Sequence, residues 1–205
     1  MRFKAFVSLG LIAGLVFISA PALANSAVAS LATANPDDAR PLVSPIPRET
    51  VAYDGPYAPG TIVVNTTERR LYLVLPGHQA LRYGVGVGRP GFAWAGVTHI
   101  ANKREWPDWT PPAQMLKRRP DLPRHMVGGI DNPLGARAMY LAGTLYRIHG
   151  SNEPDTIGQA VSSGCIRMTN DDVTDLYERV KVGATVVVLP GRPQQDQEVD
   201  ATPTE

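Results

Sequence analysis

Five short runs of β-branched and other apolar residues, each bounded by turn residues, constrain the fold of this chain more than any other feature. Runs of this length and composition are typical of β-strands. Turn-forming residues join the first three runs, as expected for antiparallel hairpins. The sequence therefore predicts a mostly β protein, with strands in Thr61 to Val64, Leu71 to Leu75, Leu81 to Val87, Ala138 to Ile148 and Ala184 to Leu189.

Two other regions interrupt or accompany these strands. From Gly88 to Gly135 the chain is crowded with Pro, Gly and Trp, and no regular central strand is expected over Trp106 to Pro112. A helix is predicted from Asn170, as its N-cap, to near Gly183, because four apolar residues follow helical spacing there. A second, short helix is expected over Asp155 to Val161. The predicted fold is a mostly β domain with one or two short helices.

The start of the chain predicts a secretory signal peptide over residues 1–24. Arg2 and Lys4 supply a positive start, Phe6 to Ile18 an apolar run, and Ala22-Leu23-Ala24 a cleavage site. The apolar run is shorter than the roughly 20 residues that cross a bilayer as a helix. We therefore expect export to the periplasm and a mature chain that begins near Asn25. An uncleaved signal anchor is the alternative.

Polar segments flank the predicted strands. Residues 25–58, rich in Ala and Pro, predict a flexible linker, and residues 191–205 a disordered polar tail. Residues 59–190 remain between them, which suffices for one domain with its own core. The formal net charge of +1, from 20 basic and 19 acidic residues, gives no basic field for nucleic acid.

The chain has a single cysteine, Cys165. Exported proteins normally pair their thiols, so this one is either buried and inert or functional. A thiol needs help to attack an amide at neutral pH, and an imidazole supplies it. His149 ends a predicted strand sixteen positions earlier. Gly150 and Gly164 allow tight turns beside the two residues, and backbone N–H groups around Gly164 and Cys165 are candidates for an oxyanion hole.

A set of ordered segments resembles the YkuD-type (ErfK/YbiS-like) L,D-transpeptidases of bacterial cell walls. The strongest is His149-Gly150 followed by Ser163-Gly164-Cys165-Ile166-Arg167-Met168. The similarity extends over roughly Pro59 to Pro190 and includes Thr61 to Val64, Arg70 to Val74, Val85 to Gly88, Trp106-Pro107, Trp109 to Pro112 and Asn132 to Gly135.

The resemblance implies a β-sandwich-like catalytic domain with Cys165 as nucleophile and His149 as general base. The Gly150 carbonyl would orient the imidazole. The donor implied is a tetrapeptide stem of peptidoglycan, cut between meso-diaminopimelate and D-alanine. The acceptor is a second diaminopimelate amine, giving a 3→3 crosslink, or the amine of an outer-membrane protein or lipoprotein. No cofactor or metal is implied, and carbapenems are the expected inhibitors.

Three further residues are candidates for substrate binding. Ser163 stands where the family commonly has His, which leaves the role of a second imidazole unfilled. Arg167 either binds a substrate carboxylate through its planar guanidinium or pairs with Asp171 or Asp172. Trp106 either shapes a wall of the cleft or pins its Pro-rich loop to the core.

Three alternatives to a transpeptidase remain open. With water as acceptor, the same site would be an L,D-carboxypeptidase. A cell-wall endopeptidase of the NlpC/P60 kind is disfavoured, because there the Cys precedes its His in the chain. An inactive peptidoglycan-binding module, with Cys165 inert, is the alternative outside enzymes. The remaining histidines, His78, His99 and His125, lack metal-ligand spacing, so no zinc site is predicted.

Overall fold

The computed structural model describes residues 44–191. The predicted signal peptide, most of the predicted linker and nearly all of the predicted tail lie outside these residues. Within them, no helix is both long and apolar enough to cross a membrane.

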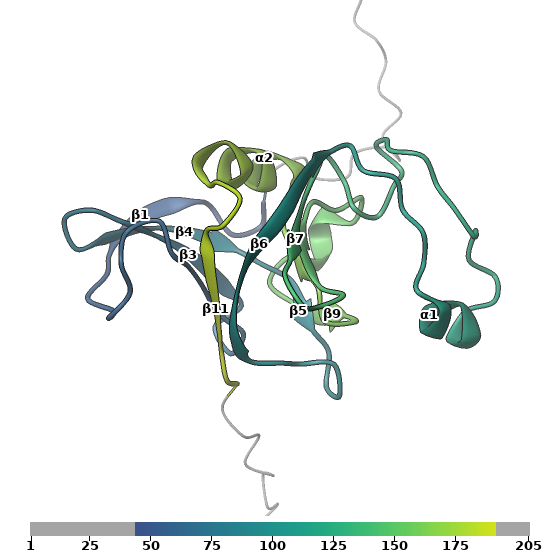
Figure 1. Ribbon diagram of the computed structural model, residues 1–205, viewed down its shortest axis with the longest axis horizontal. Coiled ribbons are helices and arrows are strands. Elements are labelled where there is room, and N and C mark those ends of the chain that lie inside the picture. The colour runs from purple at the N-terminus through teal and green to yellow at the C-terminus, as the bar shows by residue number, and fades with distance from the viewer. Residues whose placement is uncertain (1–43, 192–205) are drawn as a thin grey trace, which may run out of the picture. The chain divides into compact units, whose positions relative to one another are not determined.

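The predicted hairpins are confirmed as one half of a nine-stranded sheet (Figure 1). Strands β2 (Ile62–Asn65), β3 (Arg70–Leu75) and β4 (Gln79–Gly84) form an antiparallel meander. The last strand of the chain, β11 (Thr185–Leu189), pairs parallel with β2. Strand β1 (Glu49–Ala52) pairs with β4 at the outer edge. The linker expected over 25–58 is therefore wrong in this part.

Strand β6 (Gly96–Glu105) joins the two halves of the sheet. Its first residues pair with β11, and its later residues pair with β7 (Arg137–Leu141) after a register irregularity between Ile100 and Asn102. Such an irregularity bends a strand and increases its twist. The sheet continues through β8 (Arg147–His149) to β10 (Ile166–Arg167), and a separate pair is formed by β5 (Val87–Gly88) and β9 (Ala160–Ser162).

One apolar core lies within this curled sheet and under the main helix. Its residues come from both halves of the sheet and from the helix, and include Ile62, Leu71, Ile100, Ile148, Ile166, Met168 and Leu176. The alternation of buried and exposed residues in strands is what directs one side of each strand into this core. The predicted class, mostly β with two helices, is confirmed.

Helix α2 (Asn170–Arg179) matches the predicted helix but not its ends. Its N-cap is Thr169, whose Oγ accepts the N–H of Asp172 at 3.2 Å, and its C-cap is Val180. The helix expected over Asp155 to Val161 is wrong. A single 3-10 turn (Pro154–Thr156) is followed there by β9, whose N–H and C=O groups pair with β5.

The second helix, α1 (Ala113–Arg118), lies where no element was expected. It stands at the far end of a long loop, residues 106–136, away from the strands (Figure 1). The N–H of Trp106 donates to the carbonyl of Ala136 at 2.8 Å and closes the base of this loop. The buried side chain of Asn132 links two parts of this loop, because its amide donates to the carbonyls of Pro107 and Val127.

Candidate active site

Of the two residues expected to act together, His149 ends β8 and Cys165 directly precedes β10, which pairs parallel with β8. In the register of β8 and β10, Arg167 is opposite His149 and Ile166 is opposite Ile148. Both isoleucines are buried in the core. Successive side chains in a strand alternate between faces, so His149 and Arg167 point to the other face. Cys165 lies two residues before Arg167, just outside β10.

A serine closes the turn that presents Cys165. Ser162 Oγ accepts the N–H of Gly164 at 3.1 Å and donates to the carbonyl of Cys165 at 2.6 Å. The bond to Ser162 Oγ occupies the Gly164 N–H, which was a candidate for the oxyanion hole. Sequence reasoning missed Ser162, because nothing in its spacing separates it from Ser163.

Gly164 is required by its backbone and by its neighbours. Its φ is 110°, and a Cβ at this position would collide with the ring of Tyr146. Tyr146 stacks on Trp94, with ring centroids 5.0 Å apart, and Trp94 Nε1 donates to the Gly164 carbonyl at 2.8 Å. Two aromatic side chains that the sequence did not single out therefore fix the residue before the nucleophile.

We expect Gly164→Ala to lower the free energy of unfolding by roughly 3–5 kcal/mol, through backbone strain and collision with Tyr146 together. Gly183→Ala is the matched control. Gly183 also has a positive φ, 91°, but no atom lies within 4 Å of its Cβ position, so only strain of roughly 1–2 kcal/mol remains. Denaturant unfolding of both variants measures the difference. Equal losses would show that the aromatic pair does not constrain this turn.

His149 is buried, with 4% of its surface exposed. Its Nδ1 lies 2.6 Å from the Gly150 carbonyl oxygen. A carbonyl oxygen only accepts, so this short hydrogen bond favours the ring proton on Nδ1, while the carbonyl of Pro133 also approaches the ring. Burial, with a smaller contribution from the Arg167 guanidinium, lowers the pKa of His149 from 6.5 to about 3, against the opposing effect of the Gly150 carbonyl. The imidazole is therefore neutral at physiological pH.

Gly150 has no room for a side chain because neighbouring segments crowd it, whereas the sequence had suggested only a tight turn. A Cβ there would collide with the side-chain oxygen of Asn170 and lie 3.0 Å from the backbone nitrogen of Ala136. Asn170 Oδ1 accepts that same Ala136 N–H at 2.8 Å. The glycine thus lets α2 and the end of the 106–136 loop approach the histidine.

Acidification should destabilise the protein through His149. In the unfolded chain the imidazole binds a proton below its ordinary pKa of 6.5, whereas in the folded chain it stays neutral down to about 3. The stability from this difference is present above pH 6.5 and is lost as the pH falls towards 3. As the pH falls between these values, the free energy of unfolding of the parent should decrease by about 1.4 kcal/mol per pH unit relative to that of His149→Gln. Denaturant unfolding of both proteins over this pH range measures the difference.

The exposed His78 supplies the control for this measurement. His78→Gln should leave the slope of the parent unchanged. If His149→Gln and the parent lose stability equally between pH 6.5 and 4, the imidazole is not held neutral by the fold.

Arg167 pairs with neither acidic residue proposed for it. Its Nη1 lies 2.8 Å from Oε2 of Glu153, whereas Asp172 pairs with Arg48. Glu153 follows β8 by a few residues, and the folding of that segment back towards β10 was not visible in the sequence. The charge of Arg167 is thereby partly compensated.

A second arginine, Arg89, lies beside the nucleophile turn and was missed by the sequence reasoning. Its Nη1 donates to Ser163 Oγ at 3.1 Å and to the carbonyl of Ser162 at 3.4 Å. Its guanidinium lies over the ring of Phe92, 4.1 Å from the centroid. No carboxylate pairs with Arg89 within residues 44–191, so its positive charge is available next to Cys165.

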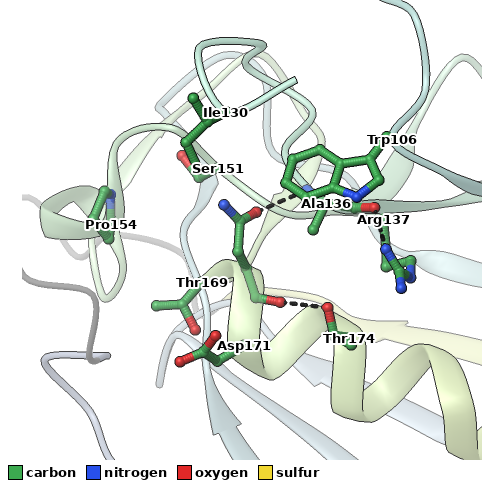
Figure 2. Close-up of a pocket in the computed structure, with 10 residues that line it drawn as sticks. Trp106, Ile130, Ala136, Arg137, Ser151, Pro154, Thr169, Asp171 and Thr174 are labelled. Carbon is green, nitrogen blue, oxygen red and sulfur yellow. Dashed lines mark hydrogen bonds between the residues drawn. The ribbon is translucent and has the colours of Figure 1, made fainter. Parts of the chain in front are cut away.

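Trp106 is exposed and does not pin its loop to the core. It has 44% of its surface exposed and a φ of 39°. It lines a hollow of about 360 Å³ together with Ile130, Ser151, Asp171 and Thr174. Figure 2 shows Trp106 and Ile130 on one side of this hollow and Asp171 and Thr174 on the other. Cys165 and His149 do not line it.

No cluster of three or more His, Cys, Asp or Glu side chains suited to a metal ion occurs in the described part of the chain.

Comparison with known proteins identifies the family of this chain. The family model described as the L,D-transpeptidase catalytic domain, YkuD, matches residues 59–188. A probable L,D-transpeptidase of Escherichia coli K12, ErfK/SrfK, is 40% identical over 137 residues, 62% of this chain and 43% of that protein. Another from the same organism, YcfS, is 38% identical over 154 residues, 70% of this chain and 48% of that protein. The chain thus spans less than half the length of these relatives.

Solved structures show the same fold. An L,D-transpeptidase from Mycobacterium smegmatis aligns with a TM-score of 0.52 at 17% identity, covering 63% of this chain and 58% of that one. L,D-transpeptidase 3 from Mycobacterium tuberculosis, in complex with a faropenem-derived adduct, aligns with a TM-score of 0.52 at 15% identity, covering 63% of this chain and 60% of that one. With the family match over residues 59–188, these findings confirm the resemblance: the chain belongs to the YkuD L,D-transpeptidase family.

Proposed function

We propose that this protein is a cysteine-dependent L,D-transpeptidase of peptidoglycan, with Cys165 as nucleophile and His149 as general base. The observation that carries the proposal is the state of His149. Its Nδ1 lies 2.6 Å from the Gly150 carbonyl oxygen, and its lowered pKa keeps the imidazole neutral at pH 7, which is the form that a general base requires. The single thiol of the chain directly precedes β10, the strand in which Arg167 is opposite His149.

The proposed first half-reaction makes a thioester. The Cys165 thiol gives its proton to Nε2 of His149 while the sulfur attacks the carbonyl carbon of diaminopimelate in a tetrapeptide stem. The C–N bond to D-alanine then breaks, and the imidazolium returns the proton to the leaving nitrogen. D-Alanine departs, and the stem remains attached to Cys165 through a C–S bond.

In the second half-reaction an amine attacks the thioester. His149 takes a proton from the attacking nitrogen, the C–S bond breaks, and the proton returns to the Cys165 sulfur. A diaminopimelate amine gives a 3→3 crosslink, and the amine of an outer-membrane protein or lipoprotein gives protein attachment. Water as acceptor would give an L,D-carboxypeptidase.

The tetrahedral intermediate carries a negative oxygen that needs hydrogen-bond donors. Because the Gly164 N–H donates to Ser162 Oγ, we assign this role to the N–H of Cys165 itself, which follows that turn. Ser162 acts indirectly, by holding the turn.

For the donor stem we propose Arg89 as the main carboxylate-binding cation. Arg167 already pairs with Glu153, whereas Arg89 bonds only neutral oxygens within residues 44–191. An arginine fork suits carboxylate recognition. Ser163, which holds the Arg89 guanidinium, then serves in substrate binding through that contact rather than as a substitute for histidine.

We also propose periplasmic action after export, and acylation by carbapenem-type inhibitors. The first rests on the predicted signal peptide. The second rests on the family, in which a solved L,D-transpeptidase carries a faropenem-derived adduct.

Digestion of purified muropeptides, followed by mass analysis of the products, tests the proposal. We expect loss of D-alanine from tetrapeptide stems together with dimers of crosslinked stems. Release of D-alanine with tripeptide monomers alone would identify a carboxypeptidase. Binding of peptidoglycan without any D-alanine release would favour an inactive wall-binding module.

A further inference from the structure

The hollow beside Trp106 lies apart from the catalytic pair and has no role in the reaction described above. We propose that it is a sugar-binding subsite, which holds the amino sugar that carries the donor stem. This inference rests on the proposed function, because it names a further part of the same substrate. Its volume, about 360 Å³, lies within the usual range of small-ligand pockets.

The exposure of Trp106 is the first observation that points to a ligand. Trp106 as a whole residue is 44% exposed, and Ile130 in the same loop is 63% exposed. The backbone of Trp106 has a φ of 39°, which a bulky residue rarely adopts. The loop therefore presents a large aromatic face to solvent in an unfavourable conformation. The C–H face of a sugar ring is apolar and flat, and it packs well on such a ring.

The opposite side of the hollow is polar. Asp171 and Thr174 stand on α2, below Trp106 and Ile130 in Figure 2, and the Thr174 hydroxyl donates to the Asn170 carbonyl. A carboxylate and a hydroxyl are the partners that sugar hydroxyl and acetamido N–H groups need. One apolar wall and one hydrogen-bonding wall match the two sides of an amino sugar.

The charges of the hollow disfavour a strongly charged ligand. Arg137 is its only cation among the described residues, and Nη2 of Arg137 lies 3.4 Å from Oε2 of Glu105. The exposed carboxylate of Asp171 would repel a phosphate or a second carboxylate. Thr169 already caps the first turn of α2, so the helix does not present all of its N–H groups to an anion. A neutral sugar is therefore the kind of ligand that the charges around the hollow favour.

The position of the hollow relative to Cys165 suits the length of a stem peptide. Both strands of the catalytic pair run towards it, because Ser151 follows β8, Thr169 follows β10, and both line its wall. Thr169 is four residues beyond Cys165, roughly 13 Å of extended chain. The diaminopimelate carbonyl is the third residue of the stem, so the sugar lies roughly 10 Å away along an extended peptide.

Kinetics on two donors test the subsite. D-Alanine release is measured from a disaccharide-tetrapeptide and from the free tetrapeptide. We expect the parent to show a kcat/KM about ten-fold higher on the glycosylated donor, since an aromatic contact typically contributes that much. Trp106→Ala should reduce this ratio to about one, and Trp106→Phe, which keeps an aromatic face, should restore part of it.

Val127→Ala is the matched control, because Val127 lies in the same loop, is 72% exposed and does not line the hollow. It should keep the ratio of the parent. A parent without preference for the glycosylated donor, or a Trp106→Ala variant that keeps the preference, would overturn the subsite. Equal losses on both donors would place the peptide in the hollow and would also overturn it.

Failure of the proposed function would look different, since the parent would release D-alanine from neither donor. The subsite is then tested alone by titrating the disaccharide of N-acetylglucosamine and N-acetylmuramic acid while the tryptophan indole N–H signals are followed by NMR. We expect the Trp106 signal, identified by its absence from Trp106→Phe, to shift. An unshifted signal overturns the proposal whatever the reaction.

Discussion

Cys165→Ala is expected to abolish D-alanine release from tetrapeptide stems, lowering the rate by roughly four orders of magnitude or more. The chain has no other cysteine, so no second thiol can replace the nucleophile. The substitution should leave the fold intact, because Cys165 is only half-buried and its carbonyl, not its sulfur, bonds to Ser162. Release is measured by chromatography of the free amino acid.

Two comparisons make this result specific. Cys165→Ser keeps the size and the polarity of the side chain, and it should be nearly as inactive, because a hydroxyl is a far weaker nucleophile than a thiol at this site. The melting temperatures of both variants should stay within a few degrees of the parent. Release by Cys165→Ala at the parent rate would show that another group attacks the stem.

His149→Ala is expected to slow acylation by about two to four orders of magnitude, the usual effect of losing a positioned general base. The neutral imidazole, with its Nδ1 bonded to the Gly150 carbonyl, is the group proposed to accept the thiol proton. Stopped-flow measurement of thioester formation separates this step from the later transfer to an amine.

Because His149 is buried, its loss also leaves a cavity, and a second variant is needed. His149→Gln fills most of this space but cannot act as a base of comparable strength. It should be slow while melting close to the parent. His78→Ala, at an exposed position, should acylate at the parent rate. A His149→Gln variant that is folded and fast would contradict the assignment of the base.

The fold could be predicted from sequence where apolar residues alternate in short runs. Ile62, Leu71 and Val186 lie in such runs, and their strands were predicted to within a few residues. Strand β6 was missed because most of its residues are exposed, among them the polar Asn102 and Arg104, so no apolar pattern marks it. Its place is set by pairing with two neighbours that are distant in sequence.

The candidate site, too, was predictable only in part. The residue types at Cys165 and His149 indicated a thiol and its base, and the pairing of β8 with β10 brings their segments side by side. Their roles in catalysis remain predictions. Contacts between distant segments were not predictable, such as Arg89 with Ser163 and Arg167 with Glu153. They depend on how β5, β9 and the turn after β8 meet, and no local spacing encodes this.

The central claim, that Cys165 becomes covalently acylated, is tested most directly by mass spectrometry after incubation with a carbapenem. A strained β-lactam opened by the thiol leaves a thioester, so the mass of the intact chain should rise by that of one inhibitor molecule. Peptide mapping should place the added mass on the fragment that contains Cys165, and Cys165→Ala should gain none. An unmodified chain after prolonged incubation, or an adduct located on any other residue, would contradict the account.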